Sequence, residues 1–129
     1  MIILDTCILI FDNLTPERLS KVALEVLEIG ETMGQLCCSD ISLWEIAMLE
    51  QKRRIIIATD YLSFMQSVLQ RRNIRVLPII PEIAALSVSL PLVQADPADR
   101  LIAATTLFYH AQLLTADQKL LDNQIPTLW

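Results

Sequence analysis

Four carboxylates follow predicted strands or begin predicted helices in this sequence: Asp5, Glu45, Asp99 and Asp117. Like charges within a few ångströms of one another repel and raise each other's pKa unless a cation lies among them. Oxygen ligands, with no His or Cys at ligand spacing, favour Mg²⁺ or Mn²⁺ over Zn²⁺. Such an ion orients and deprotonates a water molecule in phosphodiester hydrolysis. If the four acids converge, the sequence predicts metal-assisted phosphodiester cleavage.

Each acid also has an explanation in helix structure alone. Acids are favoured at helix starts because they cap free amide groups and interact with the helix dipole. Ser42-x-x-Glu45 has the spacing of a capping box, in which the two side chains satisfy each other's backbone amides. Asp96-Pro97-Ala98-Asp99 has the pattern of another helix start, with Asp96 as the cap. Only convergence of the acids indicates a site.

The elements that must position these acids begin with residues 1–6, a buried strand that ends on Asp5. Ile2, Ile3 and Leu4 are consecutive apolar residues, which is typical of a parallel strand covered on both faces. Strands and helices then alternate along the chain, so we expect a three-layer α/β/α sandwich with a mostly parallel sheet and the first strand at its centre. Ligands bind beyond the carboxyl ends of such strands.

The expected boundaries follow from capping residues, prolines and apolar periodicity. Thr6 is expected to cap the first helix, Thr15-Pro16 to begin the second, and Gly30 to end the second. The expected strands after the first are 35–39, 74–80, 112–115 and 125–129, the last at an edge, and the expected helices are 7–13, 16–30, 42–51, one that begins after Thr59 or Asp60, 81–89, 97–109 and 117–121.

Length and composition predict a single domain over residues 1–129. Apolar residues make up 53% of the chain and only two glycines occur, which disfavours linkers and low-complexity tails. No apolar run approaches the roughly 18 residues that a membrane span needs. The three cysteines lack the spacing of a disulfide framework or zinc site and suit a reducing cytoplasm.

Basic residues are concentrated in the middle of an otherwise acidic chain. The formal net charge is −5, which disfavours non-specific binding to nucleic acid through the whole surface. Six of the ten basic residues lie in two clusters, Lys52-Arg53-Arg54 and Arg71-Arg72-Asn73-Ile74-Arg75. Two interpretations stay open: solvated cations near helix carboxyl termini, or a local surface that contacts phosphate.

Five motifs in order resemble the PIN-domain ribonucleases, most closely the toxins of VapBC-type toxin–antitoxin pairs. They are Leu4-Asp5-Thr6, Ser42-Leu43-Trp44-Glu45-Ile46-Ala47, Arg75-Val76-Leu77-Pro78, Asp96-Pro97-Ala98-Asp99-Arg100-Leu101-Ile102-Ala103-Ala104 and Leu114-Thr115-Ala116-Asp117. The resemblance implies that Asp5, Glu45, Asp99 and Asp117 bind the metal, with Asp96 as an outer member.

Three further residues support this site in the same interpretation. Thr6 and Thr115 are expected to support it, Thr115 through a hydrogen bond, and Arg100 either to contact phosphate or to neutralise Asp96 or Asp99. The chain departs from the family pattern at Cys7, where related toxins often carry Asn or His.

The resemblance implies Mg²⁺- or Mn²⁺-dependent endonucleolytic cleavage of RNA in the cytoplasm, inhibition of translation, a homodimer, and neutralisation by a cognate antitoxin. Two other functions fit parts of the pattern. A PIN-like module could bind RNA or a protein without cleaving RNA. A receiver-like domain phosphorylated on Asp5 would also place acids at strand ends, but it needs a lysine at the end of a late strand, and Lys119 lies inside a predicted helix.

Overall fold

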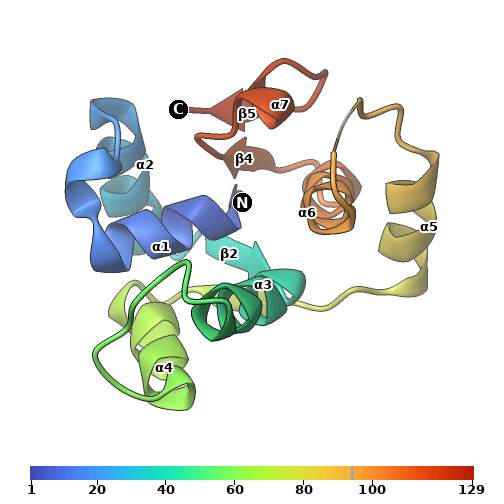
Figure 1. Ribbon diagram of the computed structural model, residues 1–129. Coiled ribbons are helices and arrows are strands. Elements are labelled where there is room, and N and C mark those ends of the chain that lie inside the picture. Colours follow the sequence, from blue (N-terminus) through green and yellow to red (C-terminus); the bar gives the residue numbers. More distant parts are fainter. Residues whose placement is uncertain (94) are drawn as a thin grey trace.

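The computed structural model describes residues 1–93 and 95–129 and is built around a five-stranded parallel sheet (Figure 1). The strand order is β3-β2-β1-β4-β5, and each neighbouring pair is parallel. The first strand lies at the centre, which confirms the predicted α/β/α architecture and its parallel sheet. The strands are β1 (Ile2–Leu4), β2 (Leu36–Ser39), β3 (Arg75–Leu77), β4 (Gln112–Leu114) and β5 (Thr127–Leu128).

Helices follow or precede each strand. They are α1 (Thr6–Leu14), α2 (Lys21–Thr32), α3 (Ile41–Gln51), α4 (Tyr61–Arg71), α5 (Pro81–Ser89), α6 (Pro97–Phe108) and α7 (Gln118–Leu121), with a short 3₁₀ helix, η1, at Pro16–Arg18. Asp60, Asp96 and Asp117 cap α4, α6 and α7 with their side chains, as the sequence predicts. Among the described residues, no helix is long and apolar enough to cross a membrane.

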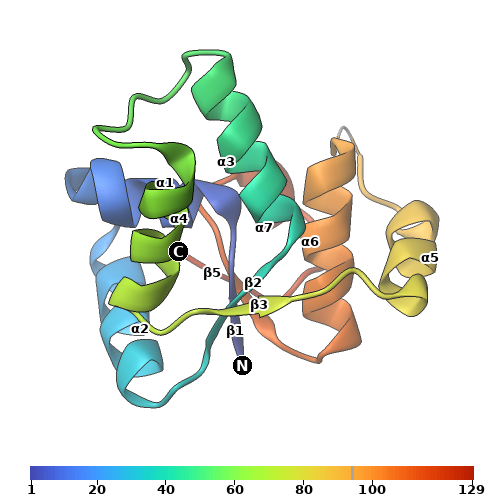
Figure 2. The ribbon, with the colours of Figure 1, turned by 90° about the horizontal axis from the view of Figure 1, so that it is seen from below.

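Two hydrophobic cores lie on opposite faces of the sheet, because neighbouring residues of a strand point to opposite sides. Leu4 and Leu114 pack into one core with side chains from α1, α2, α3 and α4. Ile3 and Leu113 pack into the other with side chains from α6 and α7, and α5 lies on the outer side of α6 (Figure 2). The consecutive apolar residues of β1 and β4 follow from burial on both faces.

Three predicted helix boundaries are wrong. Asp5, not Thr6, caps α1, and its carboxylate accepts a hydrogen bond from the Thr6 amide. Pro16 begins only the short η1 helix, and α2 begins after Ser20, whose hydroxyl caps it. Gly30 does not end α2, because the helix continues to Thr32. A Cβ atom at Gly30 would overlap the Leu36 side chain, so this glycine allows α2 to approach β2 closely.

The predicted capping box at the start of α3 is also wrong. Asp40 occupies the cap position and makes no side-chain capping hydrogen bond. Ser42 and Glu45 lie within the helix instead, and both contact Thr6 on α1. The third strand is shorter than predicted and ends before Pro78, which lacks the amide hydrogen that a further strand pairing would need.

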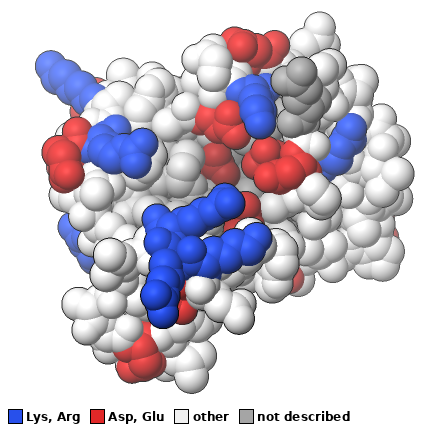
Figure 3. All heavy atoms as spheres, in the orientation of Figure 1, with Lys and Arg blue, Asp and Glu red and all other residues white. Residues whose placement is uncertain are grey.

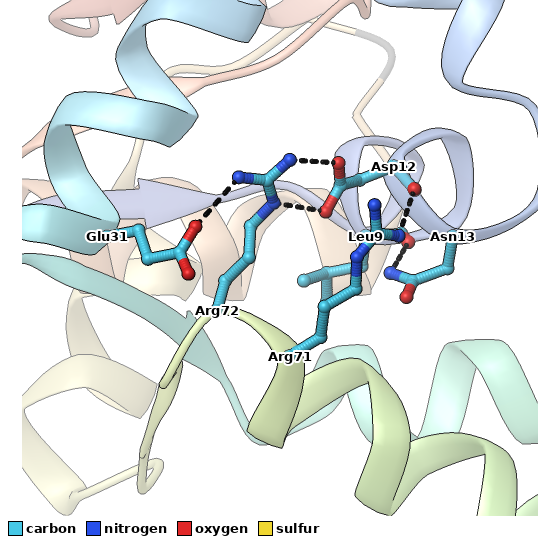
Figure 4. Close-up of polar contacts among 6 residues, drawn as sticks. All are labelled: Leu9, Asp12, Asn13, Glu31, Arg71 and Arg72. Carbon is cyan, nitrogen blue, oxygen red and sulfur yellow. Dashed lines mark hydrogen bonds and ion pairs between the residues drawn. The ribbon is translucent and has the colours of Figure 1, made fainter.

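An ion-paired cluster connects α1, α2 and α4 (Figure 4). The Arg72 guanidinium donates to both carboxylate oxygens of Asp12, at 2.6 and 2.7 Å, and to Glu31 at 3.0 Å. Arg71 donates to the Asp12 carbonyl oxygen at 2.8 Å. The hydrogen bonds with Asp12 raise the pKa of Arg72. Part of the second basic cluster therefore belongs to the fold.

Candidate active site

The predicted acids gather beyond the carboxyl ends of the central strands. Asp5, Glu45 and Asp99 line one pocket of about 170 Å³, and Asp117 begins α7 next to the end of β4. Acidic side chains occupy a hollow on this face of the molecule (Figure 3). A larger pocket of about 470 Å³ lies between residues 90–92 and 122–125, but none of these acids lines it.

Asp5 is the most deeply buried of these acids, with 4% of its surface exposed. One carboxylate oxygen accepts from the Thr6 amide at 2.7 Å. The other accepts from the Thr115 hydroxyl at 2.6 Å and from the Cys7 thiol at 3.4 Å. Burial raises the pKa of Asp5 although these hydrogen bonds favour the charged form. Asp5 is therefore fixed in position by neutral donors.

Glu45 is held through a chain of two hydroxyl groups. The Thr6 Oγ1 lies 2.5 Å from Glu45 Oε1 and 2.9 Å from the Ser42 Oγ. An ionised carboxylate only accepts, so Thr6 must donate its single proton to Glu45 and accept the Ser42 proton. Ser42 is fully buried. Burial raises the pKa of Glu45, the Thr6 hydrogen bond opposes that rise, and the charges of Asp5 and Asp96 add to it.

The pKa of Asp99 depends on the charges of the other acids in the site. Its pKa is raised to about 7, first by burial and then by the charges of Asp96, Asp5, Asp117 and Glu45, in that order. Asp96 caps α6 by accepting from the Asp99 amide at 2.8 Å, which places the two acids one turn apart. The other four predicted acids therefore all act on the Asp99 carboxyl group.

Thr115 joins two of the acids. Its hydroxyl donates to Asp5 and accepts from the Asp117 amide at 3.0 Å. Thr115 is fully buried directly after β4, and Asp117 is the cap of α7. The segment that follows β4 thus positions Asp117 relative to Asp5, which directly follows the neighbouring strand β1.

The PIN domain family model matches residues 2–124 of this chain. This chain belongs to the PIN-domain family. The protein named Ribonuclease VapC22, from Mycobacterium tuberculosis, is 33% identical to it over 132 residues. That alignment covers 99% of this PIN domain and 98% of the relative.

Solved structures include chains with the same fold. VapBC2 from Rickettsia felis, bound to a DNA fragment from its promoter, contains a chain with a TM-score of 0.74 and 17% identity, covering 99% of this PIN domain and 98% of that chain. A toxin–antitoxin complex from Klebsiella pneumoniae gives a TM-score of 0.67 and 21% identity, covering 100% and 97%. At these identities the likeness concerns the fold.

Arg100 contacts the backbone around the end of α5 in this PIN domain. Its guanidinium donates to three backbone carbonyl groups, those of Ser87, Leu90 and Leu92, at 2.7 to 3.1 Å. Arg100 therefore binds carbonyl groups at the carboxyl end of α5 and in the segment after it. Within the described ranges, no ion pair joins Arg100 to Asp96 or Asp99.

Cys7 lines the acidic pocket of the PIN domain and is partly exposed. Burial, followed by the charge of Asp5, raises the pKa of its thiol. The neutral thiol therefore acts as a weak donor to Asp5 rather than as a nucleophile.

The carboxylate oxygens of this PIN domain have the chemistry that a hard divalent cation needs. In residues 1–93 and 95–129, no three carboxylate, thiol or imidazole groups are gathered tightly enough to hold an ion as they stand. However, the charges of four other acids raise the pKa of Asp99, and no described Lys or Arg side chain forms an ion pair with any of the five. PIN-domain ribonucleases depend on metal ions in general. Oxygen ligands with uncompensated negative charge are the environment that Mg²⁺ and Mn²⁺ prefer.

Sequence reasoning missed the role of Ser42. Its spacing to Glu45 matches a helix cap, and no local signal shows that both side chains contact Thr6, which lies 36 residues from Ser42 and 39 residues from Glu45. The contact exists because β1 and β2 are neighbours in the sheet, which brings α1 and α3 together.

Proposed function

We propose that this PIN domain is a divalent-metal-dependent endoribonuclease and the toxin of a toxin–antitoxin pair. The gathering of four other acids around Asp99, with Asp5, Glu45 and Asp99 lining one pocket, carries the proposal. The identity with a protein named a ribonuclease, over nearly the full length of both chains, supports the choice of RNA as substrate. We assign Mg²⁺ or Mn²⁺ because the donors are carboxylate oxygens.

The residues of the site have distinct roles in this proposal. Asp5, Glu45, Asp99 and Asp117 would hold the ion, with Asp96 at the outer side. A bound divalent ion would orient a water molecule, lower the pKa of that water and stabilise charge on the phosphate. Thr115 and Thr6 keep the Asp5 and Glu45 carboxylates in one orientation through hydrogen bonds of 2.6 and 2.5 Å.

Partners and location complete the proposal. Structures titled as toxin–antitoxin complexes share this fold, which supports a cognate antitoxin as the protein partner. We further propose a homodimer, in the cytoplasm, where the three free cysteines would stay reduced.

RNA cleavage by the purified protein tests this function. We expect cleavage with Mg²⁺ or Mn²⁺, none with EDTA, and at least about a hundredfold loss for Asp5→Asn and Asp99→Asn, because each removes a charged ligand. Fragment ends from a defined single-stranded RNA, separated on a gel, provide the measurement.

Glu25→Gln is the matched control, since it removes an exposed carboxylate on α2. This variant should cleave at the wild-type rate. Activity that survives chelation or both site substitutions would contradict the proposal, as would equal losses in the control variant.

A further inference from the structure

Three cations follow α3 directly, and we call Lys52, Arg53 and Arg54 the α3 basic segment. All three are exposed. For the part of the chain that the structure describes, no hydrogen bond or ion pair involves their side chains. Arg72 of the other basic cluster is instead paired with Asp12 and Glu31. The α3 basic segment is therefore free to bind an anion from solution.

The same helix carries this segment and one wall of the acidic pocket. Glu45 and Leu49 line the pocket, and Lys52 is the residue at the carboxyl end of α3. Lys52 lies seven residues after Glu45, so the two are on the same side of the helix and roughly 10 Å apart along it. Figure 3 shows Lys and Arg side chains gathered over the end of α3, beside the acidic hollow.

A structural explanation accounts for only part of this arrangement. The carboxyl end of a helix favours cations among the residues of its last turn. Arg53 and Arg54 lie beyond the helix, and Arg53 has a backbone φ of 57°, so the chain has already left the helical path. Helix electrostatics therefore does not require three successive cations here.

Charge complementarity suggests the ligand. A phosphodiester chain with one phosphate among the acids and their metal has further phosphates on both sides, each with a negative charge. The net charge of −5 makes the rest of the surface unfavourable for such a chain. We propose that the α3 basic segment binds the RNA phosphates that flank the one being cut. This inference rests on the proposed function and specifies how the substrate is held.

RNA affinity in a binding-only background tests the inference. We would compare Lys52→Gln/Arg54→Gln with Lys21→Gln/Arg75→Gln, each made together with Asp99→Asn, on a single-stranded RNA. Lys21 and Arg75 are exposed, so each double variant removes one lysine and one arginine charge. We expect on the order of tenfold weaker binding at about 0.1 M salt for the first pair only.

Salt dependence and turnover distinguish phosphate contacts from a folding defect. The slope of log Kd against log salt should become shallower by roughly 0.7 for each lost contact with single-stranded RNA. With Asp99 intact, the first pair should raise KM, leave kcat and the metal-concentration dependence unchanged, and unfold at the wild-type urea concentration.

Three results separate the two proposals. Equal RNA affinity for both double variants would overturn the inference, as would loss of antitoxin binding with unchanged RNA affinity, because the segment would then serve a protein partner. A wild-type protein that cleaves no RNA, but whose RNA affinity still depends on Lys52 and Arg54, would overturn the proposed function and support the phosphate-binding surface.

Discussion

Asp5 and Asp12 are two equally buried carboxylates at the start and in the last turn of the same helix, each with 4% of its surface exposed. Both oxygens of Asp12 accept from the Arg72 guanidinium. The Asp5 oxygens accept from a backbone amide, a hydroxyl and a thiol. The two carboxylates are equally buried, but Asp12 is paired with a positively charged side chain and Asp5 is bound by neutral donors.

This difference distinguishes Asp12, an acid that stabilises the fold, from Asp5, an acid of the candidate active site. A buried charge is tolerated when a permanent partner compensates it, and Arg72 is such a partner for Asp12. Neutral donors orient Asp5 but leave its charge uncompensated, and other acids lie close by. The site therefore retains negative charge that a diffusible cation can neutralise.

The largest expected effect comes from removing the partner of Asp12. Arg72→Gln leaves a buried carboxylate unpaired and should lower the free energy of unfolding by about 3–5 kcal/mol, measured by urea titration. Arg72→Lys keeps the charge without the two-pronged contact and should lose less. Arg54→Gln, at an exposed arginine, should change stability by less than about 0.5 kcal/mol. Equal losses for Arg72→Gln and Arg54→Gln would remove the distinction between the two clusters.

Removing the charge of an acid in the candidate active site should change stability in the opposite direction. The pKa of Asp99 in the folded protein, about 7, lies above its ordinary value of 3.8, so the folded state binds the proton more tightly than the unfolded chain does. Stability should therefore fall as pH rises between these two values and stay reduced above them. Asp99→Asn removes the charge and should increase the free energy of unfolding by about 1–3 kcal/mol near pH 8, a range that allows for partial solvent screening.

Urea unfolding in EDTA at several pH values measures this effect. The advantage of Asp99→Asn over wild type should shrink toward about pH 4, where the wild-type carboxyl is protonated in the folded state. Glu25→Gln should give no such pH-dependent difference. A destabilised Asp99→Asn at neutral pH would mean that Asp99 stabilises the fold, as Asp12 does.

The sequence predicts the parts of this fold that depend on local chemistry. Consecutive apolar residues indicate β1, and Asp60, Asp96 and Asp117 cap the helices where expected. The position of Asp5 at the end of β1 follows from the apolar residues before it. These features are encoded by neighbouring residues in the chain. The grouping of Asp5 with distant acids follows instead from the resemblance of the five motifs to the PIN-domain family.

Two of the wrong predictions, at Gly30 and Ser42, concern residues whose partners are distant in the sequence, and the sequence leaves the role of Arg72 open for the same reason. Gly30 is required by the approach of Leu36, and Ser42 by Thr6 on another helix. The Arg72–Asp12 contact spans 60 residues. Local patterns at these positions match turn and capping rules equally well, so only the packed structure distinguishes the alternatives.

The smallest expected effect comes from a change at Ser42, which tests how neutral hydrogen-bond donors position the acids. Ser42→Ala removes the donor to Thr6, so the Thr6 hydroxyl can rotate away from Glu45, and Mn²⁺ binding should weaken roughly tenfold. Stability should fall by about 1 kcal/mol. Ser87→Ala is the matched control, because its buried hydroxyl donates to the Ala84 carbonyl outside the site.

The control should lose similar stability but bind Mn²⁺ as wild type does, as measured by electron paramagnetic resonance without RNA. Ser42→Cys, which keeps a weak donor, should fall between wild type and Ser42→Ala. If Ser42→Ala and Ser87→Ala bind Mn²⁺ equally well, Thr6 holds Glu45 without help from Ser42. The hydroxyl chain would then contribute to packing alone, as the Arg72 cluster contributes to the fold.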